Sequence, residues 1–174
     1  DEALGFPLSK VVFEGPEDEL TKTEYAQPAI LTVSIAAFEA LKAISEDLSP
    51  SFVAGHSLGE YTALVASEAL ELEDGVRLVN IRGKLMQQAV PLGVGAMAAI
   101  IGLNKEIVEE LCQFVSTAEC LCEPVNYNSP QQIVVSGHAE AVKRVAELAK
   151  ERGARRALML NVSAPFHSSL MRPV

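Results

Sequence analysis

The chain has 174 residues, so we expect one domain or a domain with a small insert. Hydrophobic residues make up 49% of it, enough for a substantial core, and the net charge of −9 argues against nucleic acid as a partner. We expect no membrane partner and no signal peptide, because no apolar run approaches the ~20 residues of a membrane span.

The first half of the chain predicts mainly helices. Residues 8–14 fit a short strand or a helix end, and an acidic turn follows at 15–19. Pro28 fits the first turn of a helix that runs to Ile44 and that we expect to be buried. The later elements are a buried strand at 51–54, a helix at 60–69 and a helix from Glu73 or Asp74 to Met86.

The second half alternates strands with helices. We expect strands at 96–103, 119–126, 132–137 and 155–162, and helices at 105–115, capped by Asn104, and at 139–152. A turn at 128–130 separates the two middle strands. The order β-α-β-β-α-β is the split, ferredoxin-like arrangement, of a size for a lobe inserted into a larger α/β unit. The predicted division is 1–94 with 158–174 for the larger unit, and 95–157 for the insert.

The three cysteines, Cys112, Cys120 and Cys122, cluster in one segment without a histidine at zinc-finger spacing. An odd number outside a secretory context indicates reduced thiols. We interpret them as structural and expect no metal site.

The motif Gly55-His56-Ser57-Leu58-Gly59 lies between the predicted strand at 51–54 and the helix at 60–69. A Gly-x-Ser-x-Gly motif in this setting holds a serine on a tight turn, and we expect both glycines to be needed for close backbone approach. Free N–H groups at the start of the helix can then stabilise an oxyanion. Ser57 could instead simply cap the helix. The context favours a nucleophile.

A serine nucleophile needs a base, and three histidines are available. We expect His56 to point away from the line of attack, and we interpret His138 as a surface cap residue. His167 is the favoured base, because it lies in a polar loop just after a strand, where catalytic groups usually occur.

Two basic features each leave two interpretations open. Arg82 either extends to solvent from an apolar helix or faces a cleft beside Ser57, where its planar fork would bind a carboxylate. Residues 143–156 hold six basic and two acidic residues. They form either a solvated helix with ion pairs or a docking patch for a phosphate-bearing or acidic partner.

Ordered motifs along nearly the whole chain resemble the malonyl-CoA:acyl carrier protein transacylase family. They are GHSLGEYTALVA at 55–66, IRGKLMQQA at 81–89, GAMAAIIGL at 95–103, NYNSPQQIVVSG at 126–137 and VSAPFHSSLM at 162–171. The resemblance implies an α/β-hydrolase-like subdomain with an inserted ferredoxin-like (βαββαβ) subdomain. It also implies transfer of malonyl from coenzyme A to the phosphopantetheine thiol of acyl carrier protein, for fatty acid biosynthesis.

The same resemblance assigns roles to residues. Ser57 attacks the thioester, His167 takes the proton and Arg82 pairs with the malonyl carboxylate. The backbone N–H of Leu58 supplies half of the oxyanion hole. The remaining matches are Gln27, Asn128 and Gln132 in the substrate cleft, Phe166 narrowing the pocket, and Arg155 and Arg156 near the coenzyme A phosphates. The expected protein is a cytoplasmic monomer that uses malonyl-CoA as substrate and needs no cofactor.

The family's N-terminal Gly-Gln-Gly-Ser-Gln segment has no counterpart in this sequence, so we expect an internal portion that lacks both ends and has little activity by itself. Three alternatives remain: an acyltransferase of a polyketide pathway, a serine thioesterase or hydrolase, and a non-catalytic interaction fragment. Hydrolases with this residue order require an acidic residue between the serine and the histidine. Between Ser57 and His167 no acidic residue stands in a convincing strand-end loop.

Overall fold

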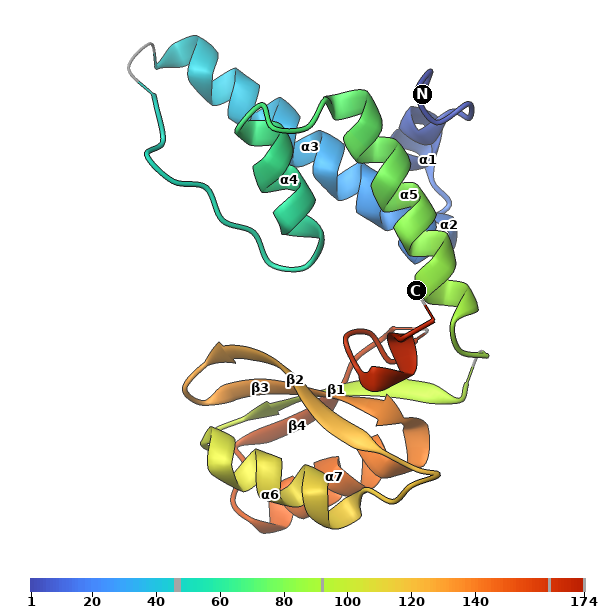
Figure 1. Ribbon diagram of the computed structural model, residues 1–174, viewed down its shortest axis with the longest axis vertical. Coiled ribbons are helices and arrows are strands. Elements are labelled where there is room, and N and C mark those ends of the chain that lie inside the picture. The colour runs from blue at the N-terminus through green and yellow to red at the C-terminus, as the bar shows by residue number, and fades with distance from the viewer. Residues whose placement is uncertain (46–47, 92, 163, 174) are drawn as a thin grey trace. The chain divides into compact units, whose positions relative to one another are not determined.

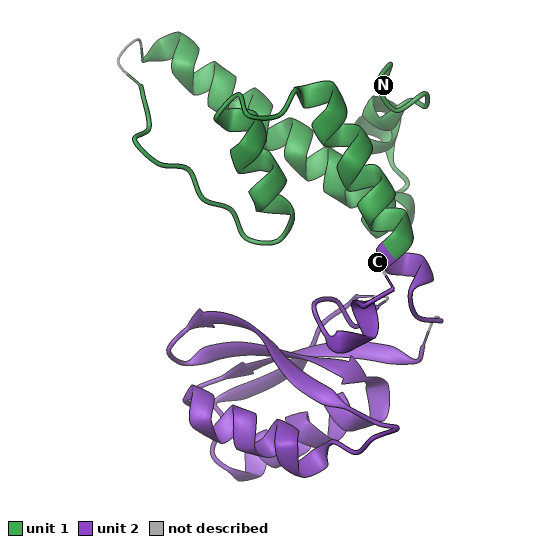
Figure 2. Ribbon diagram, in the orientation of Figure 1, with its two compact units in different colours: residues 1–85 green, residues 86–174 purple. Residues whose placement is uncertain are grey.

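The computed structural model describes residues 1–45, 48–91, 93–162 and 164–173. The chain mixes helices and a sheet, and it divides into two compact units, residues 1–85 and 86–174 (Figures 1 and 2). The division into 1–94 with 158–174 and 95–157 stays a prediction.

The first unit is helical. Its helices are α1 (Leu8–Glu14), α2 (Glu17–Leu20), α3 (Thr23–Ile44), α4 (Leu58–Ala66) and α5 (Leu72–Gln88), the last of which continues past residue 85. The segment that could have been strand or helix is therefore helix α1. The predicted acidic turn is wrong in part, because Glu17, Asp18 and Glu19 form the first turn of α2 behind Pro16. Acidic side chains stabilise the N-terminal end of a helix.

The core of this unit lies where α3, α4 and α5 meet. Its buried residues are Leu31, Ile35, Leu58, Val76 and Val79. Gly75 lets α5 approach α4 closely, because a Cβ there would lie 2.9 Å from Cγ2 of Val65. Leu58, the first residue of α4, is one of the buried core residues, so the start of α4 is held in the core.

Helix α3 begins at Thr23, and Pro28 lies inside it rather than in its first turn. A proline in a helix interior has no N–H to donate to the carbonyl four residues earlier, which here is that of Glu24. The side chain of Asn80 on α5 replaces the missing donor, with its Nδ2 2.8 Å from the Glu24 oxygen. Asn80 is only 5% exposed. The gap left by Pro28 therefore becomes a link between α3 and α5.

Replacing Asn80 by Ala should lower the free energy of unfolding by about 1–3 kcal/mol, because the partly buried Glu24 carbonyl loses its hydrogen-bond partner. Urea unfolding followed by circular dichroism measures the change. Lys84→Ala, at an exposed position of α5, is the control and should change stability by less than about 0.5 kcal/mol. Equal effects of the two substitutions would contradict the role of Asn80.

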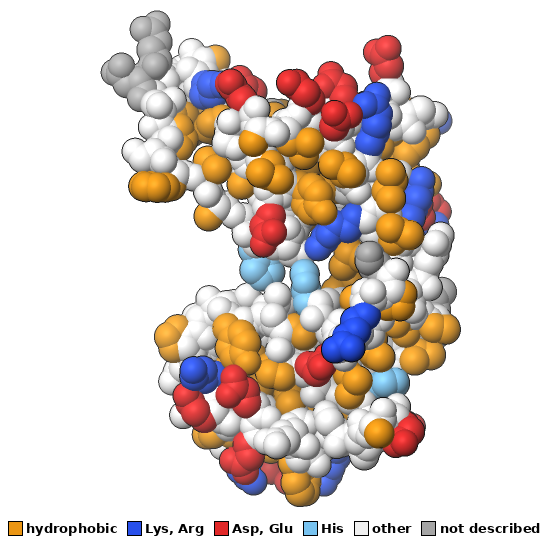
Figure 3. Space-filling view, viewed as in Figure 1, with side chains coloured by type: hydrophobic (Ala, Val, Ile, Leu, Met, Phe, Trp, Pro, Cys, Tyr) orange, Lys and Arg blue, Asp and Glu red, His pale blue; other side chains and the backbone are white. Residues whose placement is uncertain are grey.

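The prediction that the helix ending at Ile44 is buried holds only for its first half. The buried residues of α3 lie between Gln27 and Ile35, whereas Val33, Leu41 and Ile44 are 57%, 46% and 83% exposed. By length and composition alone, α3 could cross a membrane, a test that the core helix of a soluble protein also passes. Hydrophobic side chains reach the surface among charged ones over the helices of residues 1–85 (Figure 3).

The predicted strand at 51–54 is wrong. These residues are irregular, and Phe52 is 93% exposed. A strand is stable only when a neighbour pairs with its backbone groups. The described residues of 1–85 include no strand, so the apolar run that precedes Ser57 has nothing to pair with.

The second unit is a four-stranded sheet with two helices. Its elements follow the predicted order: β1 (Gly95–Ile101), α6 (Lys105–Val115), β2 (Cys122–Ser129), β3 (Gln132–His138), α7 (Ala139–Glu151) and β4 (Arg156–Met159). A short 3₁₀ helix, η1 (Ser169–Met171), follows. The strands lie in the order β2-β3-β1-β4, and each neighbouring pair is antiparallel. Asn104 caps α6 as predicted, accepting from the Ile107 N–H at 3.1 Å.

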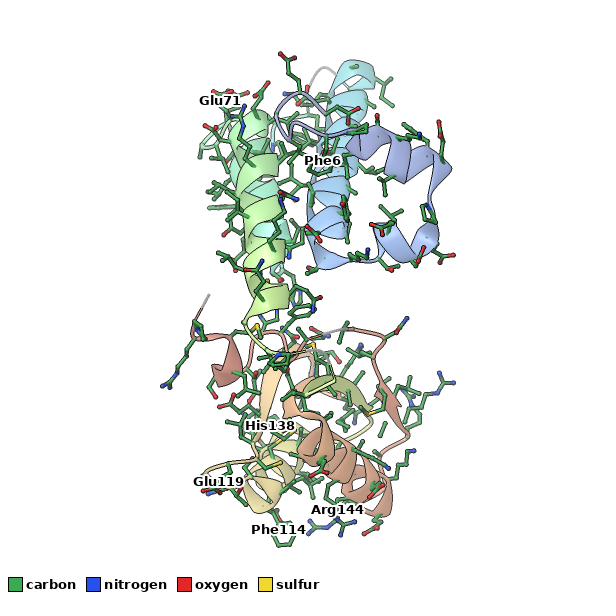
Figure 4. All side chains as sticks on the ribbon, turned by 90° about the vertical axis from the view of Figure 1, so that its right-hand side faces the viewer. Phe6, Glu71, Phe114, Glu119, His138 and Arg144 are labelled. Atoms are coloured by element: carbon green, nitrogen blue, oxygen red, sulfur yellow. The ribbon has the colours of Figure 1, made fainter. Side chains whose placement is uncertain are left out.

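Helices α6 and α7 cover one face of the sheet. Alternate strand residues such as Ile100, Ile133 and Val135 pack there against Val108 and Val142. The opposite face carries a smaller apolar cluster of Met97, Ala99 and Val134, on which Phe166 packs. Phe114 and Arg144 extend from the two helices away from the sheet (Figure 4).

The bounds of all four strands differ from the prediction, and those of the second and last strands differ most. The second strand begins at Cys122 and runs to Ser129, so the turn lies at 130–131 rather than at 128–130. The last strand covers only Arg156–Met159, although the Leu160 N–H still donates to the Met97 carbonyl of β1 at 2.9 Å.

The cysteines are free thiols, as predicted. Cys112 and Cys122 lie in the helix-side core with their sulfurs 4.0 Å apart. Hydrogen bonding to the Cys112 thiol and burial raise the pKa of the Cys122 thiol far above its ordinary value. The Cys122 thiol is therefore neutral, as that of a structural core residue is.

Candidate active site

Ser57 stands on a strained turn at the start of α4. Its backbone has φ 55° and ψ −112°, a conformation that costs a non-glycine residue about 1–3 kcal/mol. The Gly59 N–H donates to the His56 carbonyl at 2.9 Å and closes the turn. Ser57 occupies the N-cap position, yet its side chain makes no capping hydrogen bond. The alternative that Ser57 simply caps the helix is therefore wrong. Its hydroxyl instead accepts a hydrogen bond from Arg82.

The two glycines of the motif differ in what they do. A Cβ at Gly55 would overlap the backbone of Gly59 and Glu60, so this position requires glycine. A Cβ at Gly59 would meet no heavy atom within 4 Å among the described residues. The prediction that close approach needs both glycines is thus wrong for Gly59.

Replacing Gly55 by Ala should destabilise the protein by about 3–5 kcal/mol, because the backbone that the new methyl meets cannot move without opening the turn. Gly59→Ala is the matched control, and it should leave stability unchanged or raise it by about 0.5–1 kcal/mol, since alanine is the better helix former. Thermal unfolding measures both. A Gly55→Ala variant as stable as the control would contradict this account of the turn.

Arg82 extends from α5 to the serine. Its Nη2 donates to Oγ of Ser57 at 3.0 Å, and its Nη1 donates to Oε1 of Gln27 at 2.5 Å. The guanidinium carbon lies 5.8 Å from the centre of the Tyr61 ring, within range of a cation–π contact. Among the described residues no carboxylate forms an ion pair with Arg82. No carboxylate of the described residues therefore neutralises the charge beside Ser57.

Of the two interpretations of Arg82, the structure places its side chain beside the serine rather than in solvent. Gln27, 6% exposed, lies in the same group, and its Nε2 donates to Oγ1 of Thr23 at 2.8 Å. Leu58, whose N–H was assigned to the oxyanion hole, is the first residue of α4. The first N–H groups of a helix have no partner within the helix, so this one is available to a ligand.

A groove of 680 Å³ lies next to Ser57 within the first unit. Its walls are apolar side chains of α3, the irregular segment before the serine, and the first turns of α4. The lining residues include Ile30, Phe38, Phe52, Ser57 and Thr62. The volume is in the range of pockets that hold small organic ligands.

His167 belongs to the second unit and lies in a loop that is anchored on both sides. Its φ of 65° is positive, and its side chain is exposed. Before it, Pro165 packs so closely on Gly95 of β1 that a Cβ on the glycine would overlap the ring. After it, the Ser169 N–H donates to Oε2 of Glu123 at 2.6 Å. The backbone on both sides of His167 is therefore fixed to the sheet.

His138 occupies the N-cap position of α7, but its side chain is half-buried and makes no capping hydrogen bond, so the interpretation as a surface cap residue is wrong in part. Nδ1 of the His138 ring accepts a hydrogen bond from the Leu121 backbone N–H at 3.0 Å. The backbone N–H of His138 donates to the Leu121 carbonyl at 2.8 Å. This pair of bonds ties the end of β3 to the segment before β2, and Figure 4 shows His138 beside the sheet. Its role is structural.

The remaining predicted residues of the second unit lie on or near the sheet. Asn128 and Gln132 are exposed at the end of the β2–β3 hairpin, and Gln132 and Arg156 both pair with Ile101 of β1. Arg155 and Arg156 line a small pocket of 330 Å³ with Ile101. In the basic segment, Arg144 pairs with Glu147 at 3.5 Å and Arg152 with Glu110 at 3.3 Å.

Sequence reasoning missed Thr23 and Asn80. The spacing of Thr23 and Gln27, four residues apart, would have indicated their contact if the helix had been predicted to begin at Thr23. Among the described residues no group of His, Cys, Asp or Glu side chains could hold a metal ion.

Comparison with known proteins gives a consistent result. The family model of the acyl transferase domain matches residues 1–174. The malonyl CoA-acyl carrier protein transacylases of Bacillus subtilis and Haemophilus influenzae are 51% and 49% identical over 99% of the chain, and the chain covers 54% and 55% of their lengths. The chain therefore spans about half the length of these curated relatives.

Solved structures agree. The malonyl CoA-acyl carrier protein transacylase of Coxiella burnetii has a TM-score of 0.95 and 45% identity, covering 99% of this chain and 54% of its own. A malonyl-transacylase in complex with a type II polyketide synthase acyl carrier protein has a TM-score of 0.93 and 46% identity, over 99% of this chain and 55% of its own. From the match along its whole length, the chain belongs to the acyl transferase domain family.

Proposed function

We propose that the whole protein transfers the malonyl group from coenzyme A to the phosphopantetheine thiol of acyl carrier protein, through a malonyl ester of Ser57, for fatty acid biosynthesis. The observation that carries the proposal is the contact of Arg82, which has no carboxylate partner among the described residues, with a serine held on a strained turn. Such a pair suits an acyl group that bears a free carboxylate.

The proposed reaction has two symmetrical halves. Oγ of Ser57 attacks the thioester carbonyl and its proton passes to His167, while the Leu58 N–H stabilises the oxyanion. The C–S bond breaks, and His167 returns the proton to the coenzyme A thiolate. The thiol of acyl carrier protein then attacks the serine ester, its proton passes to His167, and Ser57 leaves with that proton.

The other assigned residues bind rather than react. Arg82 pairs with the malonyl carboxylate, and Gln27, Asn128, Gln132 and Phe166 shape the substrate cleft. Arg155 and Arg156 contact the phosphates of coenzyme A. In this proposal malonyl-CoA is a substrate and the reaction needs no cofactor; the protein is a cytoplasmic monomer.

The proposed architecture is an α/β-hydrolase-like subdomain with a ferredoxin-like insert. The antiparallel strand order β2-β3-β1-β4 and the element order of the second unit support the ferredoxin-like part. The turn at Ser57, followed by a helix, supports the hydrolase-like part.

Intact-mass spectrometry of the whole protein with malonyl-CoA tests the proposal. One malonyl group should appear on the protein, map to Ser57 and move to the thiol of added holo-acyl carrier protein. Release of free malonate without an acceptor would instead indicate a hydrolase. Binding of acyl carrier protein without any acylation would indicate a non-catalytic interaction protein.

A second candidate is the same transfer in a polyketide pathway. It is favoured by the similarity to a malonyl-transacylase in complex with a polyketide synthase acyl carrier protein. Comparing transfer rates to a fatty acid and a polyketide carrier protein separates the two.

A further inference from the structure

The position of the Arg82 guanidinium depends on a neutral side chain. Nη1 is held by Oε1 of Gln27, and this leaves Nη2 directed at Ser57. Because no carboxylate among the described residues pairs with Arg82, Gln27 is its main polar support besides the serine itself. A guanidinium that must bind a carboxylate in two-pronged fashion has to be held at a fixed angle.

Gln27 is in turn held by Thr23. Nε2 of Gln27 donates to Oγ1 of Thr23 at 2.8 Å, one helical turn earlier on α3. Gln27 is 6% exposed, so protein groups rather than water hold its amide, and the Thr23 hydroxyl is one of them. With Nε2 on Thr23, the oxygen end of the amide faces Arg82.

Thr23 itself is fixed against the helix that carries Arg82. A Cβ at Gly83 would lie 2.6 Å from the Thr23 carbonyl oxygen, so the two backbones touch at the residue next to Arg82. The bond from Asn80 to the Glu24 carbonyl fixes the same contact. The backbone of Thr23 is thus held against α5. Gln27 links the Thr23 hydroxyl to the guanidinium of Arg82.

We propose that Thr23 is a positioning residue that, through Gln27, sets the selectivity of the Ser57 site for acyl groups that carry a carboxylate. The inference rests on the proposed function. It predicts that loss of the Thr23 hydroxyl weakens the reaction of malonyl-CoA but not that of acetyl-CoA, which has no carboxylate for Arg82 to bind.

The test compares variants of the whole protein by the rate of Ser57 acylation with malonyl-CoA and with acetyl-CoA. Thr23→Val, which keeps the shape but removes the hydroxyl, should lower the malonyl-to-acetyl ratio of kcat/KM about tenfold, the value of one lost hydrogen bond. The change should lie mainly in KM for malonyl-CoA. Thr23→Ser restores the hydroxyl and should restore the ratio.

Thr32→Val is the matched control, because it removes a hydroxyl of the same helix that bonds to the Pro28 carbonyl at 2.7 Å, away from Arg82. It should leave the ratio unchanged. An unchanged ratio in Thr23→Val, or an equal loss with both substrates, overturns the inference. If Thr23→Val does not fold, Thr23→Ala takes its place with the same criteria. A wild-type protein that forms no malonyl-serine overturns the proposed function itself.

Discussion

Replacing Ser57 by Ala should abolish malonyl transfer, with a fall in rate of about 10⁴–10⁶-fold, the usual cost of removing a serine nucleophile. The substitution removes only Oγ, which would form the ester. It also relieves nothing in the backbone, since alanine meets the same strain at φ 55°. The protein should therefore fold and bind malonyl-CoA while remaining unacylated, as measured by intact mass and by transfer to holo-acyl carrier protein.

The matched control is Ser34→Ala, which removes a hydroxyl from the wall of the same groove. It should leave acylation within about twofold, because the proposed mechanism gives Ser34 no role. Transfer by Ser57→Ala at the wild-type rate would show that the acyl group travels by another route, and it would remove Ser57 from the mechanism.

Replacing Arg82 by Ala should lower kcat/KM for malonyl-CoA by about 100-fold, because the substrate carboxylate would lose its charged partner in a partly buried site. Acetyl-CoA carries no carboxylate, so its acylation rate should stay the same or rise. The preference for malonyl over acetyl should therefore collapse. Competition between the two substrates, followed by intact mass, measures the ratio directly.

Arg77→Ala provides the comparison for Arg82. Arg77 lies on the same helix, but it bonds to the Ala3 carbonyl at 3.0 Å and to Asp74 at 3.1 Å. Its loss should leave the malonyl-to-acetyl ratio unaltered. If both arginine variants reduce the ratio alike, a general change of α5 rather than a carboxylate contact is responsible.

The sequence predicts the second unit well because its patterns are local. The N-cap at Asn104, the apolar alternation of the strands and the element order all follow from neighbouring residues. The run at 51–54 fails for the opposite reason. Its apolar residues have strand character, but pairing depends on a neighbour that no local pattern supplies.

The site was predictable as far as residue types, but not as far as contacts. The glycine at 55 and the turn at Ser57 follow from the motif. The approach of Arg82 to Ser57 joins residues on two helices, so the sequence left it open between cleft and solvent. Thr23 was missed because Pro28 was interpreted as the helix start, a rule that holds only when no other element supplies the missing donor.

Pro28 has a consequence for how this helix pair keeps its register. An alanine at 28 would donate its own N–H to Glu24 and compete with Asn80 for that oxygen. The Glu24 carbonyl would then no longer depend on α5 for a hydrogen-bond partner. Pro28 thus leaves the Glu24 carbonyl of α3 without a partner inside the helix. Asn80 of α5 supplies that partner, and the same placement of α5 brings Arg82 beside Ser57.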